Sequence, residues 1–183
     1  AKGEERGMLE EALERLKEKL YCLIPDIIYG EDEETMEAAV GRLLREKNAT
    51  LSTAESCTGG TIAQMITSVP GSSDYFRGSV VAYSNDAKEK ILGVDASTIK
   101  KFGAVSRETC ELMAKGAVKV LSSDYAVAVT GIAGPGGGSD EKPAGTVWIA
   151  AASPAGIVSE KYLFGSDRNI NIRRSSLAAL NLL

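Results

Sequence analysis

Ser56 lies in a segment whose residue types and spacing could support covalent chemistry. The segment 53–60 reads TAESCTGG and connects a β-type apolar run to a helical pattern. Gly59 and Gly60 would let the backbone turn tightly into that helix, whose unpaired first-turn amides would point at the group that Ser56 attacks or binds. This arrangement predicts a nucleophile beside an oxyanion site. A serine that only caps the helix is the alternative.

The absence of histidine restricts how Ser56 could be activated. Ser-His-Asp and Cys-His mechanisms are excluded, and so are metal sites with histidine ligands. The proton acceptor for Ser56 would therefore be a lysine, tyrosine, aspartate or glutamate. The three cysteines, Cys22, Cys57 and Cys110, form no Cys-x-x-Cys pair, which indicates a reduced, cytoplasmic protein with no disulfide framework and no zinc site.

The segment 83–88 (YSNDAK) contains a candidate base. Tyr83 ends a predicted strand and Lys88 lies one turn into the following helix, so both could face one cleft. A free lysine has a pKa of about 10.4, and burial or a neighbouring cation would have to lower it by roughly 2–3 units. Lys90 points elsewhere on the helix and is expected to be solvated. A surface position is the alternative for Lys88.

A glycine-rich segment, 130–138 (TGIAGPGGG), follows the most apolar predicted strand. Thr130 opens it, and amides near Gly134, Gly136 and Gly137 could approach a phosphate or an oxyanion closely. No Lys-Ser/Thr pair follows, so the segment is not a P-loop. A flexible loop is the alternative.

Three arginines near the C-terminus could hold an anion. Arg168, Arg173 and Arg174 lie in or next to the last predicted helix, and one of them could bind a phosphate bidentately. Surface positions are the alternative for all three.

The elements that must position these residues alternate between strand and helix from residue 49 onward. The apolar spacing predicts strands at 50–54, 80–83, 125–130, 146–151 and 158–164, and helices at 58–69, 85–92, 107–121 and 169–182. The last two strands would form a hairpin around 154–156. We therefore predict an α/β fold, a three-layer α/β/α sandwich with a mixed, mostly parallel sheet. Ligands bind such sheets at the carboxyl ends of the strands.

The N-terminal part of the chain lacks the alternation of strands and helices that is predicted for the rest. Amphipathic spacing predicts a helix at 8–20 and a second one around 36–44, and the apolar run 27–29 after Pro25 could be a short strand. We interpret 1–32 as a linker-like helical extension and 33–183 as the domain. The sequence contains no run of 18 apolar residues, so no membrane span is predicted. A net charge of −4 without a basic stripe disfavours nucleic acid as a partner.

Four segments together resemble the CinA C-terminal family, which includes the nicotinamide-nucleotide amidases (NMN deamidases). They are TAESCTGG (53–60), VAYSNDAK (81–88), GAVSRE (103–108) and VTGIAGPGGG (129–138), in the family's order. The resemblance covers about 33–183, and 1–32 resembles the segment that precedes this domain in longer, two-part CinA proteins. It implies hydrolysis of the carboxamide of nicotinamide mononucleotide to nicotinate mononucleotide and ammonia, with neither metal nor cofactor.

The resemblance also implies roles for individual residues. Ser56 would be the nucleophile, Lys88 its base, and Tyr83 would assist through its hydroxyl. Thr130 would line the pocket and Arg168 would hold the substrate's phosphate, with Arg173 and Arg174 as competitors. The oxyanion hole could come from amides at 57–60 or at 134–137, Pro135 excepted, and the sequence does not choose between them.

Two other functions stay open at this point. The domain could be a pyridine-nucleotide-binding or regulatory module without turnover, or it could act on partner proteins in the competence and DNA-damage responses to which CinA proteins are linked by name. A homo-oligomer is expected in each case, because loops that form a pocket at strand ends often pack against a partner.

Overall fold

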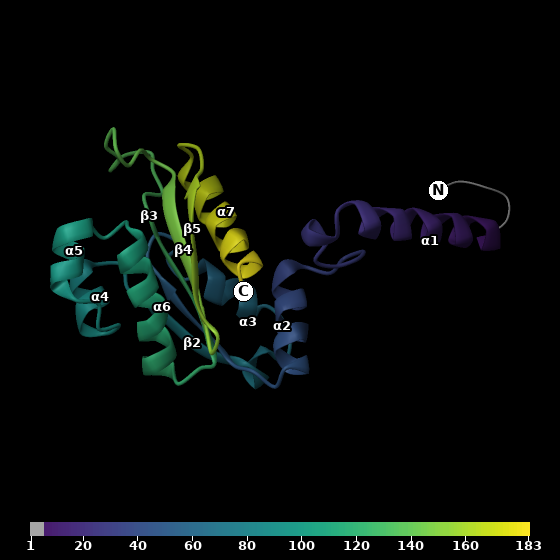
Figure 1. Cartoon of the computed structure of the whole chain (residues 1–183), viewed down its shortest axis with the longest axis horizontal. Helices are drawn as coiled ribbons and strands as arrows, with labels where there is room; N and C mark the ends of the chain where they lie inside the picture. The colour runs from purple at the N-terminus through teal and green to yellow at the C-terminus, as the bar shows by residue number, and fades with distance from the viewer. Residues whose placement is uncertain (1–5) are drawn as a thin grey trace. The chain divides into compact units, whose positions relative to one another are not determined.

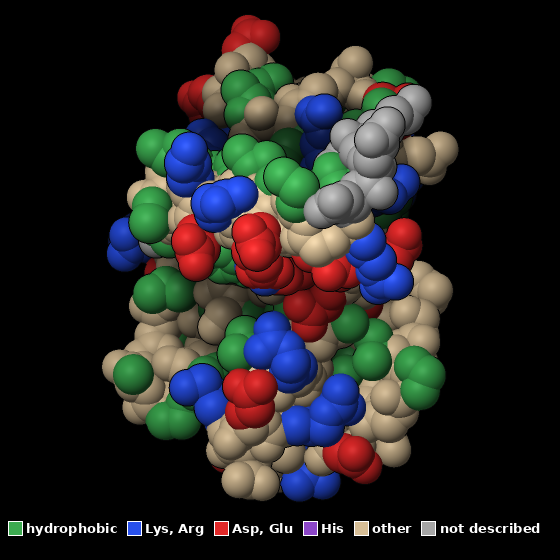
Figure 2. Space-filling view, turned by 90° about the vertical axis from the view of Figure 1, so that its right-hand side faces the viewer, with side chains coloured by type: hydrophobic (Ala, Val, Ile, Leu, Met, Phe, Trp, Pro, Cys, Tyr) green, Lys and Arg blue, Asp and Glu red, His purple; other side chains and the backbone are tan. Residues whose placement is uncertain are grey.

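The computed structural model describes residues 6–183, which divide into two units. The first unit ends at Thr35 and the second runs from Met36 to Leu183. Each unit is described by itself. Figure 2 shows both basic and acidic side chains at the surface.

The first unit consists of helix α1 (Arg6–Leu23), the 3₁₀ turn η1 (Pro25–Ile27) and the segment that follows. The helix predicted at 8–20 is confirmed and is longer at both ends, and none of its residues is buried. The short strand predicted at 27–29 is wrong. Pro25 begins a 3₁₀ turn instead, in which the amide of Ile28 donates to the carbonyl of Pro25, because the fixed φ of proline suits a helical first position.

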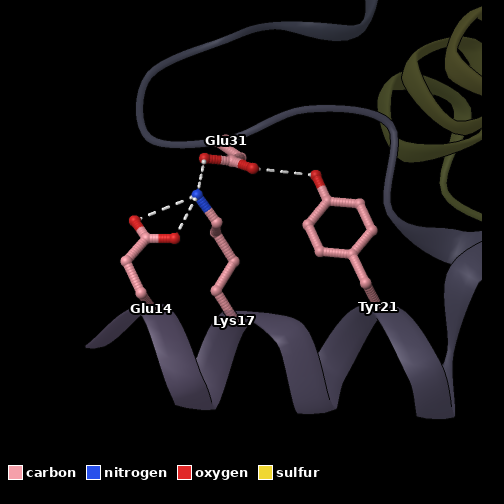
Figure 3. A network of polar contacts seen from close by, with 4 residues as sticks. All are labelled: Glu14, Lys17, Tyr21 and Glu31. Carbon is pink, nitrogen blue, oxygen red and sulfur yellow. Dashed lines mark hydrogen bonds and ion pairs between the residues drawn. The ribbon is translucent and has the colours of Figure 1, made fainter. Parts of the chain in front are cut away.

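A polar network connects the segment after η1 with α1 (Figure 3). The ammonium of Lys17 lies 2.9 Å from the Glu14 carboxylate and 3.3 Å from that of Glu31, and the Tyr21 hydroxyl donates to Glu31 at 3.0 Å. All of these groups are partly or largely exposed to solvent, so each contact contributes little to stability.

Five strands form one mixed sheet within the described residues. In sheet order they are β2 (Phe76–Val81), β1 (Leu51–Glu55), β3 (Tyr125–Gly131), β4 (Thr146–Ser153) and β5 (Gly156–Leu163). β1 pairs in parallel with β2 and β3, whereas β4 pairs antiparallel with β3 and β5. Only β4 therefore runs against the other strands, and the expected mixed, mostly parallel sheet is confirmed.

Helices cover both faces of this sheet, as the predicted three layers require (Figure 1). On one face lie α2 (Met36–Glu46), α3 (Thr61–Thr67) and α7 (Arg168–Asn181), and on the other α4 (Asn85–Lys90), α5 (Ala96–Phe102) and α6 (Arg107–Leu121). Side chains alternate between the faces along β3. Val127 and Val129 join the core under α2, α3 and α7, while Ala126 and Ala128 join the core under α6.

Several elements depart from the predicted bounds for local reasons. Helix α3 begins at Thr61 rather than 58, because Gly59 and Gly60 adopt positive φ angles of 63° and 101° and form the turn before it. Strand β2 begins at Phe76, four residues before the predicted start. Helix α5 was not predicted at all. The bounds of α6 agree with the prediction, and Ser106 caps it by accepting from the amide of Thr109 at 3.2 Å.

The topology brings three polar segments to one edge of the sheet. Because β1, β2 and β3 are parallel, their carboxyl ends lie side by side. Ser56 follows β1, Lys88 lies in the helix after β2, and Thr130 is near the end of β3. This is the edge at which open α/β sheets bind ligands.

Candidate active site

Ser56 is held by the backbone of the neighbouring strand. Its amide donates to the carbonyl of Val129 in β3 at 3.0 Å, which continues the β1–β3 ladder by one residue. The residue is buried, with 8% of its surface exposed. Its Oγ lies 3.0 Å from Nζ of Lys88. The structure thus joins two of the residues that the sequence singled out.

Lys88 is one of the largest fully buried side chains of the protein, with 1% of its surface exposed. Its Nζ donates to the Ser56 hydroxyl at 3.0 Å and to the backbone carbonyls of Ala82 at 2.8 Å and Tyr83 at 3.4 Å. Within residues 6–183 it makes no ion pair with a carboxylate. Burial disfavours the ammonium form and lowers the pKa of Lys88 below its ordinary value. The side chain therefore has the environment of a base.

The neighbouring Lys90 provides a contrast on the same short helix. Its side chain is exposed and forms an i,i+4 ion pair with Asp86 at 2.8 Å. Helix α4 thus turns one lysine into the protein and the other to solvent. Ser84 caps the helix by accepting from the amide of Ala87 at 3.1 Å, which fixes the direction in which Lys88 enters.

A cavity of about 260 Å³ lies beside this pair. Its lining contains the Arg168 guanidinium and the Lys88 amine, and no carboxylate among the described residues, so it suits an anionic or neutral polar ligand. The lining residues are Ser56, Cys57, Tyr83, Asn85, Lys88, Ala104, Val105, Thr130, Gly131, Ile132, Ala133, Gly134, Gly136 and Arg168.

Arg168 and Tyr83 both line the cavity and are hydrogen-bonded to each other. Arg168 is the first residue of α7, and it donates from Nη2 to the Tyr83 hydroxyl at 3.1 Å and from Nη1 to the carbonyl of Gly134 at 3.3 Å. The Tyr83 hydroxyl was expected near Lys88, but the structure places it against Arg168 and gives Lys88 only the Tyr83 carbonyl. Arg173 and Arg174 are exposed and do not line the cavity.

Thr130 is buried near the end of β3 and lines the cavity. Its hydroxyl donates to the carbonyl of Ala104 at 2.8 Å, so its oxygen can still accept a hydrogen bond from a ligand. Ala104 and Val105 belong to the GAVSRE segment, which had no assigned role. The structure shows that this segment forms one wall of the cavity.

The candidate glycines separate into two groups. Gly134 and Gly136 line the cavity, whereas Gly59, Gly60 and Gly137 do not. The amide of Gly60 donates to the Glu55 carboxylate at 2.9 Å and that of Gly59 to the carbonyl of Ser56 at 3.2 Å. Neither amide is available to a ligand.

The backbone amides of the two residues after Ser56 remain as candidate donors to an oxyanion. In the part of the chain that the structure describes, no acceptor is found for the backbone amides of Cys57 and Thr58, and Cys57 lines the cavity. Its thiol is buried and belongs to the hydrophobic core, as expected of a packing residue. Burial raises the pKa of Cys57 to about 12, so the thiol stays protonated and is a poor nucleophile.

Sequence reasoning missed residues that support the site rather than react in it. Glu55 was quoted only as part of a motif, and the structure shows that its buried carboxylate accepts from amides of the first turn of α3. Asn171 donates from Nδ2 to the carbonyls of Ala133 and Gly165 at 2.9 and 2.7 Å, and so holds the loop behind the cavity to α7. Lys142 donates to the carbonyls of Phe102 and Val105.

Residues 6–183 contain neither a candidate metal cluster nor a candidate membrane-spanning helix. No group of three or more histidine, cysteine, aspartate or glutamate side chains that could hold a metal ion occurs in that range. Nor is any of the described helices long and apolar enough to cross a membrane.

The domain is a three-layer α/β domain with a mixed sheet. At the carboxyl edge of that sheet, a serine is hydrogen-bonded to a buried lysine. The sequence model of the CinA C-terminal domain matches residues 33–183. The chain belongs to that family.

Curated relatives share the sequence over nearly its whole length. A CinA-like protein of Endomicrobium trichonymphae is 46% identical over 181 residues, which are 99% of this chain and 42% of that protein. A CinA-like protein of Fervidobacterium nodosum is 52% identical over 156 residues, 85% of this chain and 38% of that protein. The chain therefore spans about two fifths of the length of these relatives.

Solved structures share the fold. The competence/damage inducible protein CihA from Agrobacterium tumefaciens is 39% identical with a TM-score of 0.75, over 82% of this chain and 95% of that one. A competence-damaged protein (CinA) superfamily protein from Escherichia coli is 30% identical with a TM-score of 0.77, over 87% of this chain and 98% of that one.

Proposed function

We propose that this domain hydrolyses the carboxamide of nicotinamide mononucleotide to nicotinate mononucleotide and ammonia, with Ser56 as nucleophile and Lys88 as base. The observation that carries the proposal is the 3.0 Å hydrogen bond between Ser56 Oγ and the Nζ of a buried lysine that makes no ion pair in the described chain. Burial favours the neutral form of such a lysine, and a neutral lysine can accept a proton from a hydroxyl.

The proton transfers of the reaction involve this pair, the substrate and one water molecule. Neutral Lys88 takes the proton of Ser56 as Oγ attacks the carbonyl carbon, and a tetrahedral oxyanion forms. The Lys88 ammonium then protonates the leaving nitrogen, the C–N bond breaks, and ammonia departs. Water attacks the acyl-enzyme while Lys88 takes its proton, and the proton returns to Ser56 as the acid is released.

The amide of Cys57 is the best-supported donor to the oxyanion. It directly follows the nucleophile, lines the cavity and has no acceptor within the described residues. Removal of one such donor costs about 3–4 kcal/mol of transition-state stabilisation in known cases. The amides of Gly59 and Gly60 are already occupied.

Arg168 is proposed to bind the phosphate of the substrate together with Tyr83. Its guanidinium contacts a tyrosine hydroxyl and a carbonyl and makes no ion pair in the described structure, so its charge is available to an anion. A phosphate there would accept from both Arg168 and the Tyr83 hydroxyl. Thr130 could accept a hydrogen bond from the carboxamide nitrogen.

The decisive experiment is an assay of ammonia release from nicotinamide mononucleotide by the purified chain and by Ser56→Ala. We expect turnover by the wild type, unchanged by a chelator, and loss of turnover in the variant. Retained turnover in Ser56→Ala would exclude the mechanism. Tight binding of the nucleotide without ammonia release by the wild type would favour a binding or regulatory module.

A further inference from the structure

The carboxylate of Glu55 is completely buried next to the nucleophile. Glu55 is the last residue of β1, and none of its surface is exposed. Its Oε2 accepts from the amides of Gly60 at 2.9 Å and Ile62 at 3.1 Å. Its Oε1 accepts from the amide of Ala63 at 2.9 Å and lies 3.4 Å from two hydroxyls, those of Thr53 and Ser79. A buried carboxylate is tolerated only with this degree of hydrogen bonding.

These bonds close the loop that carries Ser56. The chain leaves β1 at Glu55, passes through 56–59, and returns at Gly60, whose amide binds the side chain of the residue where the loop began. Gly60 makes no side-chain cap for α3. The Glu55 carboxylate takes that role and satisfies amides of the first turn that would otherwise lack acceptors. The loop is therefore fixed at both ends by one side chain.

We infer that Glu55 is a positioning residue, which keeps Ser56 Oγ within hydrogen-bonding distance of Lys88 through its bonds to the first turn of α3. The inference rests on the function proposed above for Ser56 and Lys88. Glu55 itself makes no hydrogen bond or ion pair with Lys88 in the described structure. Its effect on Lys88 therefore runs through the loop geometry.

Two substitutions separate geometry from charge. Glu55→Gln keeps one oxygen, which can still accept from Gly60 and Ile62, while its amide group can donate to the Thr53 and Ser79 hydroxyls; only Ala63 loses its acceptor. Glu55→Ala removes every bond. Because a displacement of about 1 Å can cost about 100-fold, we expect kcat to fall about 100-fold in Glu55→Ala with little change in KM, but only a few-fold in Glu55→Gln. Equal losses in the two variants would mean that charge matters, and would overturn the inference.

Asp124 provides the matched control. Its Oδ2 accepts from the amide and the hydroxyl of Thr50 at 2.8 and 2.7 Å, immediately before the opposite end of β1. Asp124→Ala should lower the melting temperature and leave kcat unchanged. If Glu55→Ala behaves in the same way, with lower stability and an unchanged kcat, Glu55 has a purely structural role and the inference is wrong.

A crystal structure of Glu55→Ala tests the geometry independently of turnover. We expect the distance between Ser56 Oγ and Lys88 Nζ to exceed about 3.5 Å, beyond a hydrogen bond. A distance that stays near 3.0 Å in the variant would overturn the inference, whether or not the wild type releases ammonia. Absence of ammonia release by the wild type would contradict only the proposed function. Should Glu55→Ala not fold, Glu55→Asp serves instead, because its shorter side chain cannot reach Gly60 and Ala63 together.

Discussion

Lys17 in the first unit and Lys88 in the second have pKa values that are shifted in opposite directions. Lys17 on α1 is partly exposed to solvent, and its hydrogen bonds with Glu14 and then Glu31 raise its pKa (Figure 3). Lys88 is buried, has only a hydroxyl and two carbonyls around it, and has a lowered pKa. Neighbouring carboxylates favour the charged form of a lysine, and burial without them favours the neutral form, which is the form that a base requires. The unit that provides such burial is the one that contains the candidate site.

The largest effect is expected from removing the Lys88 amine, and removal of the Lys17 amine provides the matched control. Lys88→Met should lower kcat for ammonia release by at least about 10⁴-fold, as loss of a member of a catalytic pair does in other hydrolases. Lys17→Met should leave kcat unchanged, because its network does not contribute to the cavity. Steady-state kinetics on both variants, with circular dichroism to confirm folding, provides the measurement. Comparable losses would show that the two lysines do not differ in function.

A smaller effect is expected at the cation that holds the substrate. Arg168→Gln should raise KM for nicotinamide mononucleotide by roughly 10–100-fold, the value of a charged hydrogen bond or two. Arg173→Gln, on the same helix but outside the cavity, should change KM by less than about twofold. The test is the KM ratio between the nucleotide and its nucleoside, which lacks the phosphate. If Arg168→Gln weakens both substrates equally, Arg168 does not bind the phosphate.

The pH dependence of the reaction should follow Lys88 and not Lys17. As the pH falls through the lowered pKa of Lys88, the amine takes up a proton and can no longer accept that of Ser56. The kcat/KM value should therefore decrease by about tenfold per pH unit below that pKa. Lys17→Met should leave the midpoint in place. An increase in kcat/KM on acidification would contradict the assignment of Lys88 as the base.

The smallest effect is expected from removing residues 1–32, which are most of the first unit. A chain that starts at residue 33 lacks Lys17 and its partners but retains both cores of the second unit. We propose that it folds by itself, with kcat/KM within about twofold of the full chain. Ammonia release and thermal unfolding of the truncated chain test this. A large loss of activity in a folded truncation would give the extension a role in the site.

The sequence was sufficient to predict that Ser56 and Lys88 lie at the same edge of the sheet. Placing Ser56 after one predicted strand and Lys88 in the helix after its neighbour predicts that the two side chains share an edge, because parallel strands end together. The alternation of strands and helices likewise predicts the three layers. The short strand at 27–29 was wrong because three apolar residues do not distinguish a strand from a turn after Pro25.

Side-chain partners could not be predicted in this way. Nothing in the spacing of Tyr83 and Arg168, which are far apart in sequence, indicates that their side chains meet at 3.1 Å. The amides of Gly59 and Gly60 were candidate donors to the oxyanion, but in the structure they donate to the carbonyl of Ser56 and to Glu55. Such pairings depend on rotamers and on the exact turn of a loop, which no periodic pattern encodes.

The protonated thiol of Cys57 has a consequence for oxidative stress. Peroxides attack thiolates, and a buried thiol with a pKa of about 12 has almost none at neutral pH. A hydrolase that relies on a serine with such a neighbour should survive peroxide treatment, and the exposed Cys22 would be modified first. Replacing Ser56 by cysteine would place the sulfur against the Lys88 amine instead, and would make the centre sensitive to oxidation.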